Sequence, residues 1–316
     1  MENIALIDAH CDTAYELYHR GESLTDNTCH ISLHRAQAFS HYAQFFAIWS
    51  DKRLDDEACF TQFLSIASRF RDEIEHAKDQ IEFVRDADGL DRTWSASKSA
   101  AFLAVEDARL LAGKIERLDE LRQMGVSYLT LLWGGVSCIG GAHDTDEGLT
   151  DFGRSVARGC YRCGICPDVS HASERSTDDV LEIAAACGKT VMATHSNSYS
   201  VYAHSRNLRD RHFEAIRSLG GFVGVSLCRS HLTDITARHA TVDDVVRHID
   251  RYMELGGEHT VGLGCDFDGT DPPDGIVHLG DLTLLADALL TRGYSKNQVE
   301  NIFWKNKYEF IKNQIK

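Results

Sequence analysis

Short apolar runs recur along the chain, and a longer segment with apolar residues at helical spacing follows most of them. Runs rich in β-branched and aromatic residues predict strands, whereas apolar residues three and four positions apart predict amphipathic helices. Eight strands are predicted in this way, over residues 4–10, 43–49, 101–106, 127–133, 164–171, 190–195, 222–227 and 260–266.

Helical segments alternate with these strands, which is the pattern of repeated βα units and a parallel sheet. The helices are predicted over residues 57–78, 115–124, 151–163, 177–186, 210–219, 242–255, 282–292 and 296–313. Eight such units in 316 residues fit a closed (β/α)8 barrel better than an open doubly wound sheet, which needs fewer strands. We therefore predict an α/β fold of the TIM-barrel type.

No Gly/Ser-rich linker or low-complexity segment divides the chain, so residues 1–316 are expected to form a single domain. Three irregular stretches, 21–32, 134–149 and 268–279, follow predicted strands. In barrel enzymes the loops after the strands build the active site at the C-terminal ends of the strands, and we expect the site there. The alternative is that these stretches are ordinary connections of variable length.

The charge balance narrows the range of partners. The formal net charge is −15 at pH 7, so nucleic acids and anionic membranes would be repelled, and a small-molecule substrate is favoured. No run approaches the roughly 20 apolar residues of a membrane span. Asp8, His10 and Asp12 interrupt the apolar stretch near the start, so no secretory signal is expected. We expect a cytoplasmic protein without nucleic-acid or membrane partners.

The ten cysteines are scattered, and reduced core thiols are expected rather than disulfides. Several of them lie in apolar runs, namely Cys11, Cys187, Cys228 and Cys265. One cluster has the spacing of an iron–sulfur motif, at Cys160, Cys163 and Cys166. No fourth cysteine follows closely, so core packing is the favoured interpretation of this cluster.

Side chains that can bind metals fall at the ends of the predicted strands. His10 ends the first strand and Asp12 follows it, Glu106 ends the third, and the fifth and sixth end at His171 and His195. The strand ends of a barrel converge on one cavity. These nitrogen and carboxylate donors would suit two zinc ions with a bridging anion and an open position for water.

Two carboxylates belong to the eighth predicted strand, which Asp266 ends and Asp268 follows. Beside metals, Asp266 would act as the general base, accepting a proton from the metal-bound water and passing it to the leaving amine. Asp268 stands directly before Gly269 and is interpreted as a turn residue.

A lone histidine at a strand end is more often structural or solvated than a metal ligand, so the metal hypothesis depends on the whole set of donors. Within that set, strand alternation predicts that His10 and Asp12 point to one side while Cys11 faces the helices. The remaining histidines lie in helical or loop contexts and are predicted to be surface residues. They include His30, His34, His41, His76, His212, His239, His248 and His259.

Several longer motifs occur in order along the chain. They are Asp8-Ala-His10-Cys-Asp12, Ala104-Val-Glu106, Tyr128-Leu-Thr-Leu, Gly148-Leu-Thr-Asp-Phe-Gly153, Asp168-Val-Ser-His171, Thr194-His195-Ser-Asn-Ser-Tyr, Ser205-Arg206-Asn207 and Val261-Gly-Leu-Gly-Cys-Asp266-Phe-Asp-Gly269. With these motifs the chain resembles the membrane (renal) dipeptidase family of zinc peptidases, within the amidohydrolase superfamily of barrels. The resemblance runs essentially from end to end.

The resemblance implies a binuclear zinc site. In it, His10 and Asp12 hold one ion and His171 and His195 hold the other. Glu106 bridges the two ions, as does the hydroxide that attacks the substrate.

The resemblance also assigns roles beside the metals. Asp266 matches the general acid/base, and Arg206, with Asn207 beside it, matches the arginine that binds the terminal carboxylate of the substrate. A guanidinium suits that role because its fork binds a carboxylate through two hydrogen bonds. The alternative for Arg206 is a surface salt bridge.

Two positions depart from the family pattern. Trp133, followed by Gly134, stands where the mammalian enzymes carry a histidine that polarises the scissile carbonyl. His143 in the adjacent loop is therefore a candidate substrate-binding residue. Cys228 stands near the position of a tyrosine that lines the substrate site, with Arg229 beside it. We expect Arg229 to favour acidic substrate side chains.

We therefore expect a zinc-dependent dipeptidase of small dipeptides, including those with a D-configured C-terminal residue. One alternative is another amidohydrolase-type reaction, such as deacylation of an N-acyl amino acid or hydrolysis of a lactone. A second alternative is a non-catalytic barrel that binds ligands. The resemblance also implies a homodimer.

Overall fold

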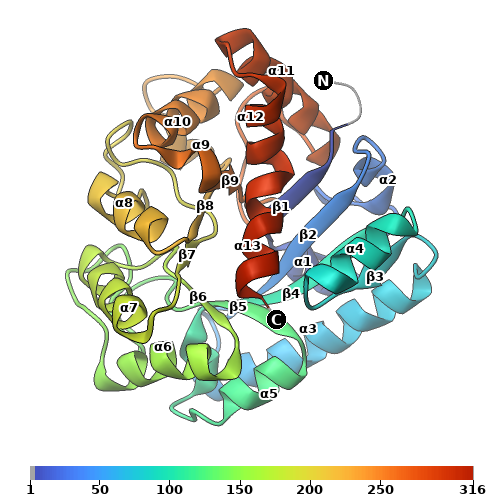
Figure 1. Cartoon of the computed structure of the whole chain (residues 1–316). Helices are drawn as coiled ribbons and strands as arrows, with labels where there is room; N and C mark the ends of the chain where they lie inside the picture. Colours follow the sequence, from blue (N-terminus) through green and yellow to red (C-terminus); the bar gives the residue numbers. More distant parts are fainter. Residues whose placement is uncertain (1–3, 316) are drawn as a thin grey trace.

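The computed structural model describes residues 4–315, and the strands within that range form one parallel sheet (Figure 1). The strand order is β2-β1-β9-β8-β7-β6-β5-β4-β3, and a further pairing of β2 with β4 closes the sheet into a barrel. The strands are β1 (Leu6–Cys11), β2 (Tyr42–Trp49), β3 (Ile81–Phe83), β4 (Ser99–Glu106), β5 (Val126–Thr130), β6 (Cys166–Asp168), β7 (Met192–Ala193), β8 (Phe222–Val225) and β9 (Val261–Leu263).

Eight of these strands make the barrel, and the short β3 pairs with the first residues of β4 beside it. The helices lie outside the sheet, as in a (β/α)8 barrel. The predicted fold class is therefore confirmed. The helices are α1 (Thr13–Arg20), α2 (Leu33–Ala36), α3 (Asp56–His76), α4 (Ala87–Ser95), α5 (Arg117–Gln123), α6 (Asp151–Cys163), α7 (Glu174–Cys187), α8 (Asp210–Ser218), α9 (Arg229–Leu232), α10 (Val242–Glu254), α11 (Leu282–Arg292), α12 (Lys296–Glu300) and α13 (Asn306–Gln314).

Helix α6 shows why several helix boundaries were predictable. The Thr150 side chain accepts a hydrogen bond from the backbone N–H of Gly153, which caps the helix at its start. Gly164 ends the helix in the left-handed region with a φ of 75°, where glycine carries no steric penalty. The helix consequently spans the predicted residues 151–163 without change.

Other predictions need correction. The predicted helix 296–313 is broken into α12 and α13 by the π-helical turn η4 (Asn301–Lys305). Helices α1 and α4 were also not predicted, and strand β3 was missed because its three residues are too few for a period to be visible. The same holds for α2, α9 and the 3-10 helices η1 (Ala108–Leu111), η2 (Gly257–His259) and η3 (Leu279–Asp281).

The strands that lead to the predicted site are shorter than expected. Strand β6 covers 166–168 of the predicted 164–171, β7 covers 192–193 of 190–195, and β9 covers 261–263 of 260–266. The chain leaves the sheet before it reaches the polar residues, since His171 and Asp266 have positive φ angles of 70° and 61°, which no strand accommodates. His171, His195 and Asp266 therefore lie beyond the strand ends, whereas His10 and Glu106 belong to β1 and β4.

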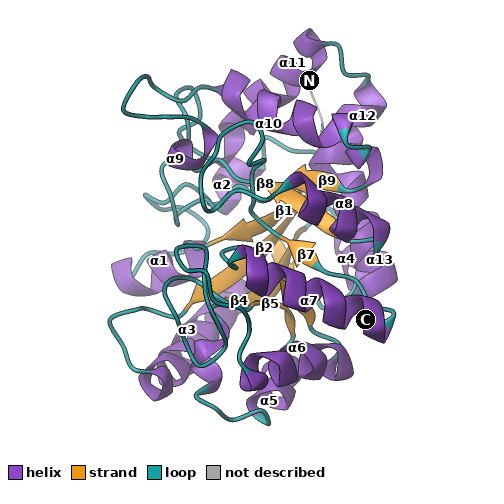
Figure 2. Cartoon of the chain, turned by 90° about the vertical axis from the view of Figure 1, so that its left-hand side faces the viewer, coloured by secondary structure: helices purple, strands orange, loops and turns teal. Residues whose placement is uncertain are grey.

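The two ends of the barrel differ. At the N-terminal ends of the strands, Phe45 and Phe102 stack inside the barrel at 4.3 Å, and α13 adds Lys307, Phe310 and Ile311 against this interior cluster. Figure 2 shows loops gathered at the side of the barrel away from α13. The open end is therefore the C-terminal one, where a barrel places its active site.

The burial of single side chains corrects the predictions for two histidines and one cysteine. His212 and His248 are buried rather than on the surface. His248 Nδ1 accepts a hydrogen bond from the backbone N–H of Ser198, and its Nε2 donates to the carbonyl of Leu232, so it joins two loops. Cys187 is exposed at the end of α7, whereas Cys11, Cys228 and Cys265 are buried as predicted.

The cysteine cluster does not form a metal-binding group among residues 4–315. Cys160 and Cys163 lie on α6 and Cys166 lies on β6, and all three are free thiols. The groups whose donor atoms converge tightly enough for an ion contain none of them. No helix in the described part of the chain has the length and apolar character needed to cross a membrane.

Candidate metal centre

The five predicted metal ligands converge at the open end of the barrel. They line or adjoin a cavity of about 560 Å³. His10 comes from β1, Glu106 ends β4, and His171 and His195 follow β6 and β7. Asp12 stands directly before α1. The structure thus brings together residues from the first to the seventh strand, as the barrel hypothesis requires.

An irregularity in β1 aims His10. The register between β1 and β2 shifts by one residue between Asp8 and Cys11. Such a bulge redirects side chains, and bulges occur often beside active sites. Cys11 faces the helix-side core, as predicted, while the imidazole of His10 turns to the cavity.

Hydrogen bonds fix the tautomer of His10. The Tyr128 hydroxyl donates to the carbonyl of Ala9 at 3.0 Å, so it accepts from His10 Nδ1 at 2.9 Å. In the neutral imidazole the lone pair is then on Nε2, which is buried and has no hydrogen-bond partner in residues 4–315. It lies 3.5 Å from Asp12 Oδ2 and 3.8 Å from Glu106 Oε2. A buried lone pair facing two carboxylates is the geometry of a metal ligand.

The other histidine pair gives a stronger indication. His171 Nδ1 lies 3.0 Å from the carbonyl of Trp133 and therefore carries the proton. His195 Nδ1 lies 2.8 Å from Thr194 Oγ1, which itself donates to Asp168, so this Nδ1 is also protonated. The two Nε2 atoms consequently face each other as lone pairs, only 2.9 Å apart. Two lone pairs at this distance repel unless a cation lies between them, so the residues fit a metal ion.

Glu106 connects the two groups of donors. Its Oε1 lies 3.0 Å from His171 Nε2 and 3.4 Å from His195 Nε2, while its Oε2 faces His10. Burial raises the pKa of Glu106, but His10 and His195 outweigh this effect and lower the pKa. A carboxylate that presents one oxygen to each group can bridge two cations.

The carboxylates around His10 give this part of the site a negative potential that favours a bound cation. Burial lowers the pKa of His10, but the charges of Glu106, Asp12 and Asp266 prevail and raise it to about 10. Burial, then Glu106, raises the pKa of Asp12 to about 6. A cation bound among these groups would supply the compensating charge.

Asp266 lies at the edge of the same group. Its Oδ1 is 3.7 Å from His10 Nε2, and its backbone N–H donates to the carbonyl of His10. Burial raises the pKa of Asp266 well above the usual value, and neighbouring Asp12 and Glu106 act in the same direction. A carboxyl with a raised pKa beside the donors is suited to hold and release a proton.

Asp268 does more than form a turn. Its side chain is buried, accepts a hydrogen bond from Thr13 Oγ1 at 2.5 Å and accepts another from the backbone N–H of His30 at 2.6 Å. Its own backbone N–H donates to His30 Nδ1. The turn after β9 is thereby tied to the segment after β1 and to the 21–32 loop.

Arg206 is buried at the opposite side of the cavity, so the surface salt bridge is excluded. Its Nη2 donates to the carbonyl of His195 at 3.3 Å. Asn207 does not face the cavity. Its Nδ2 donates to the carbonyls of Tyr202 and His231 and so holds the loop that carries Arg206.

The two other predicted substrate-binding residues have different positions. His143 lines the cavity, with its ring 5.9 Å from that of His171 and its Nδ1 2.9 Å from Ser205 Oγ. Burial, together with Arg206, lowers the pKa of His143 to about 4. Arg229 is exposed, forms an ion pair with Asp271, and is not among the described residues that line this cavity. It starts α9, whose preceding residue Cys228 faces the cavity instead.

Comparison with known proteins decides the family. The family model described as membrane dipeptidase, peptidase family M19, matches residues 1–314. The chain belongs to this family. It is therefore a metal-dependent dipeptidase, in agreement with the class expected from the sequence.

Members of the family with solved structures share the whole fold. A crystallised dipeptidase, a metallopeptidase of family M19, is 26% identical with a TM-score of 0.92, and the match covers 99% of each chain. A metallopeptidase from Rhodobacter sphaeroides, crystallised with a phosphinate mimic of the dipeptide L-Ala-D-Ala, is 25% identical with a TM-score of 0.91 over 100% of both chains. Dipeptidase tcpJ from Claviceps purpurea is 29% identical over 72% of this chain and 54% of its own length.

In this dipeptidase the cavity also contains residues that the sequence analysis did not select. One wall is aromatic. The ring centroids of Tyr15 and Trp49 lie 5.4 Å apart, and those of Trp49 and Trp133 lie 5.1 Å apart. Lys52 Nζ lies over the Trp133 ring, 5.3 Å from its centroid. Trp49 and Trp133 each end a predicted strand, so the strand-end criterion that found the ligands also applies to them.

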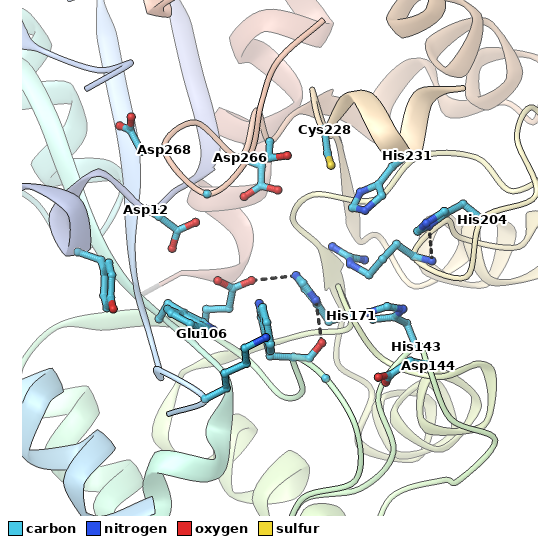
Figure 3. Close-up of a pocket in the computed structure, with 18 of the residues that line it drawn as sticks. Asp12, Glu106, His143, Asp144, His171, His204, Cys228, His231, Asp266 and Asp268 are labelled. Atoms are coloured by element: carbon cyan, nitrogen blue, oxygen red, sulfur yellow. Dashed lines mark hydrogen bonds and ion pairs between the residues drawn. The ribbon is translucent and has the colours of Figure 1, made fainter. Parts of the chain in front are cut away.

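Two further histidines, His204 and His231, line the side of the cavity around Arg206. Figure 3 shows both of them on the side of the cavity opposite Asp12. The sequence signal that could have selected them is their position, since His204 stands two residues before Arg206 and His231 three residues after Cys228.

Proposed function

We propose that this dipeptidase uses two zinc ions, one held by His10 and Asp12 and the other by His171 and His195, with Glu106 between them. The observation that carries the proposal is the Glu106 carboxylate, which presents one oxygen to each pair of ligands. Imidazole nitrogen and carboxylate oxygen are the donors that zinc takes at catalytic sites. When bound, the two ions would supply a nucleophilic water at neutral pH and polarise the scissile carbonyl.

Asp266 is the proposed general acid/base. It takes the proton of the attacking water and gives it to the departing amine, which would otherwise be a poor leaving group. Its position supports this role, because Oδ1 lies 3.7 Å from His10 Nε2 and thus beside the ligands. The direction of its pKa shift supports it as well, since burial raises the pKa of Asp266 and so favours the protonated form that donates to the amine.

Arg206 is the proposed anchor for the substrate's terminal carboxylate. It is buried on the cavity wall, and its Nε has no hydrogen-bond partner among the described residues. A dipeptide bound there would place its scissile carbonyl over the ligands and its first residue against the aromatic wall of Trp49 and Trp133. Substrates with a D-configured C-terminal residue are included in the proposal, because the relative from Rhodobacter sphaeroides binds a mimic of L-Ala-D-Ala.

The decisive experiment is hydrolysis of an L,L and L,D dipeptide library by zinc-reconstituted protein, with Asp266→Asn alongside. We expect release of free amino acids, and a loss of about 100-fold or more in kcat for the variant. Zinc content, measured in both proteins, separates lost proton transfer from lost metal. Activity undiminished in a zinc-loaded Asp266→Asn would reject the acid/base role.

Two results would point to the alternatives. Hydrolysis of N-acyl amino acids or lactones without release from dipeptides would favour an N-acyl amino acid deacylase or a lactonase, whereas equal hydrolysis of dipeptides with free and amidated C-termini would contradict the role of Arg206. Stoichiometric zinc without release from any peptide would favour a barrel that binds without turnover.

A further inference from the structure

The cavity has a carboxylate side and an imidazole side. Figure 3 shows Asp12, Asp266 and Asp268 on one side and the imidazoles of His143, His204 and His231 on the other. Glu106 and His171 lie between the two sides. Asp12 and Asp266 belong to the candidate metal-binding groups, whereas the three imidazoles belong to none of the groups found in residues 4–315. The imidazole side is thus available for the substrate.

Arg206 supplies hydrogen-bond donors to this side that the protein leaves unused. A guanidinium has five N–H groups, and in the described structure the Arg206 side chain makes one hydrogen bond, from Nη2 to the carbonyl of His195. An α-carboxylate in the proposed binding mode would take two of the remaining donors.

His204 is bound directly to the same segment. Its Nδ1 accepts a hydrogen bond from the backbone N–H of Arg206 at 3.2 Å, so the proton of this imidazole sits on Nε2, which is a donor. Its ring lies 4.7 Å from that of His231. The ring nitrogens of His231 have no hydrogen-bond partner within residues 4–315. Two imidazoles with free donor positions therefore adjoin the carboxylate anchor.

Only one protein carboxylate near these imidazoles could compete with a substrate carboxylate for their N–H groups, among the described residues that line this side of the cavity. Asp144 is the acidic residue that lines this side outside the metal-binding groups; it is exposed, and its Oδ1 already accepts from the backbone N–H of Gly135. An additional carboxylate would therefore find donors here that water alone now has to satisfy.

We propose that His204 and His231 form the subsite for the side chain of the substrate's C-terminal residue, and that the subsite takes an acidic side chain, aspartyl or glutamyl. The inference rests on the proposed function, because Arg206 must hold the α-carboxylate for the side chain of that residue to reach the imidazoles. It replaces Arg229, which lies outside the cavity, as the source of a preference for acidic substrates.

The test compares L-Ala-X dipeptides in which X is Asp, Asn, Glu, Gln or Ala, each in the L and the D form. Asp against Asn and Glu against Gln differ by charge at constant shape. We expect kcat/KM to be at least about tenfold higher for the acid than for the amide, mostly through a lower KM.

The double variant His204→Phe, His231→Phe keeps aromatic rings at both positions and removes the donors. We expect its acid-to-amide ratio to fall below about twofold. Because the ratio is taken within one protein, a loss of folded or metal-loaded enzyme does not change it. His259→Asn is the matched control, since His259 is exposed and precedes β9 at the other end of the barrel; its ratio should equal that of the parent.

The variant Lys52→Met tests whether the Lys52 ammonium group on the cavity wall, rather than the two imidazoles, causes a preference for acidic substrates. A parent enzyme that cleaves Ala-Ala but treats acids and amides alike would overturn the subsite while leaving the dipeptidase intact. A preference that survives in the double variant and disappears in Lys52→Met would also overturn it. Failure to cleave any peptide would instead reject the proposed function.

Discussion

The backbone at Gly269 passes close to two carboxylates of the candidate site. A Cβ at this position would lie 2.1 Å from Asp12 Oδ2 and 2.6 Å from Asp266 Oδ1, far inside van der Waals contact. The neighbouring Asp266 and Asp268 both have positive φ angles, of 61° and 69°, which are costly for residues other than glycine. The turn after β9 is therefore held in an unfavourable conformation by what its side chains bind.

Gly269→Ala should displace one or both carboxylates, because the added methyl group has no free space. We expect a loss of roughly 100-fold in kcat/KM, with reduced zinc occupancy if Asp12 is the group that moves. Activity, zinc content and thermal unfolding should be measured together. Full activity with full zinc occupancy would show that the turn can shift without disturbing Asp266.

At the scale of elements, a side chain on one strand of the barrel orients a candidate metal ligand on another. Tyr128 lies on β5 and His10 on β1, and the tyrosine hydroxyl joins His10 Nδ1 to the carbonyl of Ala9 in the barrel interior. The irregular register of β1 leaves this segment without regular pairing to β2. The hydroxyl therefore fixes both the ring orientation and the tautomer of His10.

Tyr128→Phe should weaken metal binding, because His10 loses the partner that keeps Nε2 unprotonated. Loss of such an outer partner typically costs about 10- to 100-fold in metal affinity, and chelator competition would measure it. A matched control is Tyr308→Phe, whose exposed hydroxyl contacts Asp91 away from the site. Equal zinc affinity in both variants would contradict the role of the Tyr128 hydroxyl.

At the scale of the whole molecule, α13 closes the N-terminal end of the barrel with an unusual side chain. Lys307 is buried, with Nζ 4.3 Å from the Phe45 ring centroid, 4.5 Å from that of Phe222 and 3.1 Å from Met192 Sδ. Burial lowers its pKa to about 7. The folded protein thus binds this proton less tightly than the unfolded chain does.

Lys307→Met should therefore stabilise the protein, and more so at neutral than at alkaline pH. The unfolded state keeps the lysine protonated up to about pH 10.5, so the cost of burying the charge applies fully below about pH 7 and disappears as the pH rises toward 10.5. We expect about 2 kcal/mol in the free energy of unfolding at pH 7, measured by urea denaturation at several pH values. A parent more stable than the variant at pH 7 would mean that the cation–aromatic contacts outweigh desolvation.

The local sequence determined the elements whose signals are local. Helix α6 was predictable because Thr150 caps it and Gly164 ends it. The (β/α)8 fold followed from the alternation of periods, and the candidate ligands were selected by their place at strand ends. The family was predictable as well, because its motifs are spread along the entire chain.

Tertiary structure alone decided which side chains share a cavity and how they are oriented. Arg206 and Arg229 are both arginines in irregular segments, yet one is buried beside His195 and the other is exposed and paired with Asp271. Helix α9 turns outward at Arg229, and four residues are too few for a visible period. The meeting of His204 with His231 and the tautomer set by Tyr128 also depend on contacts between distant segments. Periodicity and spacing report which side of its own helix or strand a residue faces. The contacts named here join segments far apart in the sequence and arise only when the barrel closes.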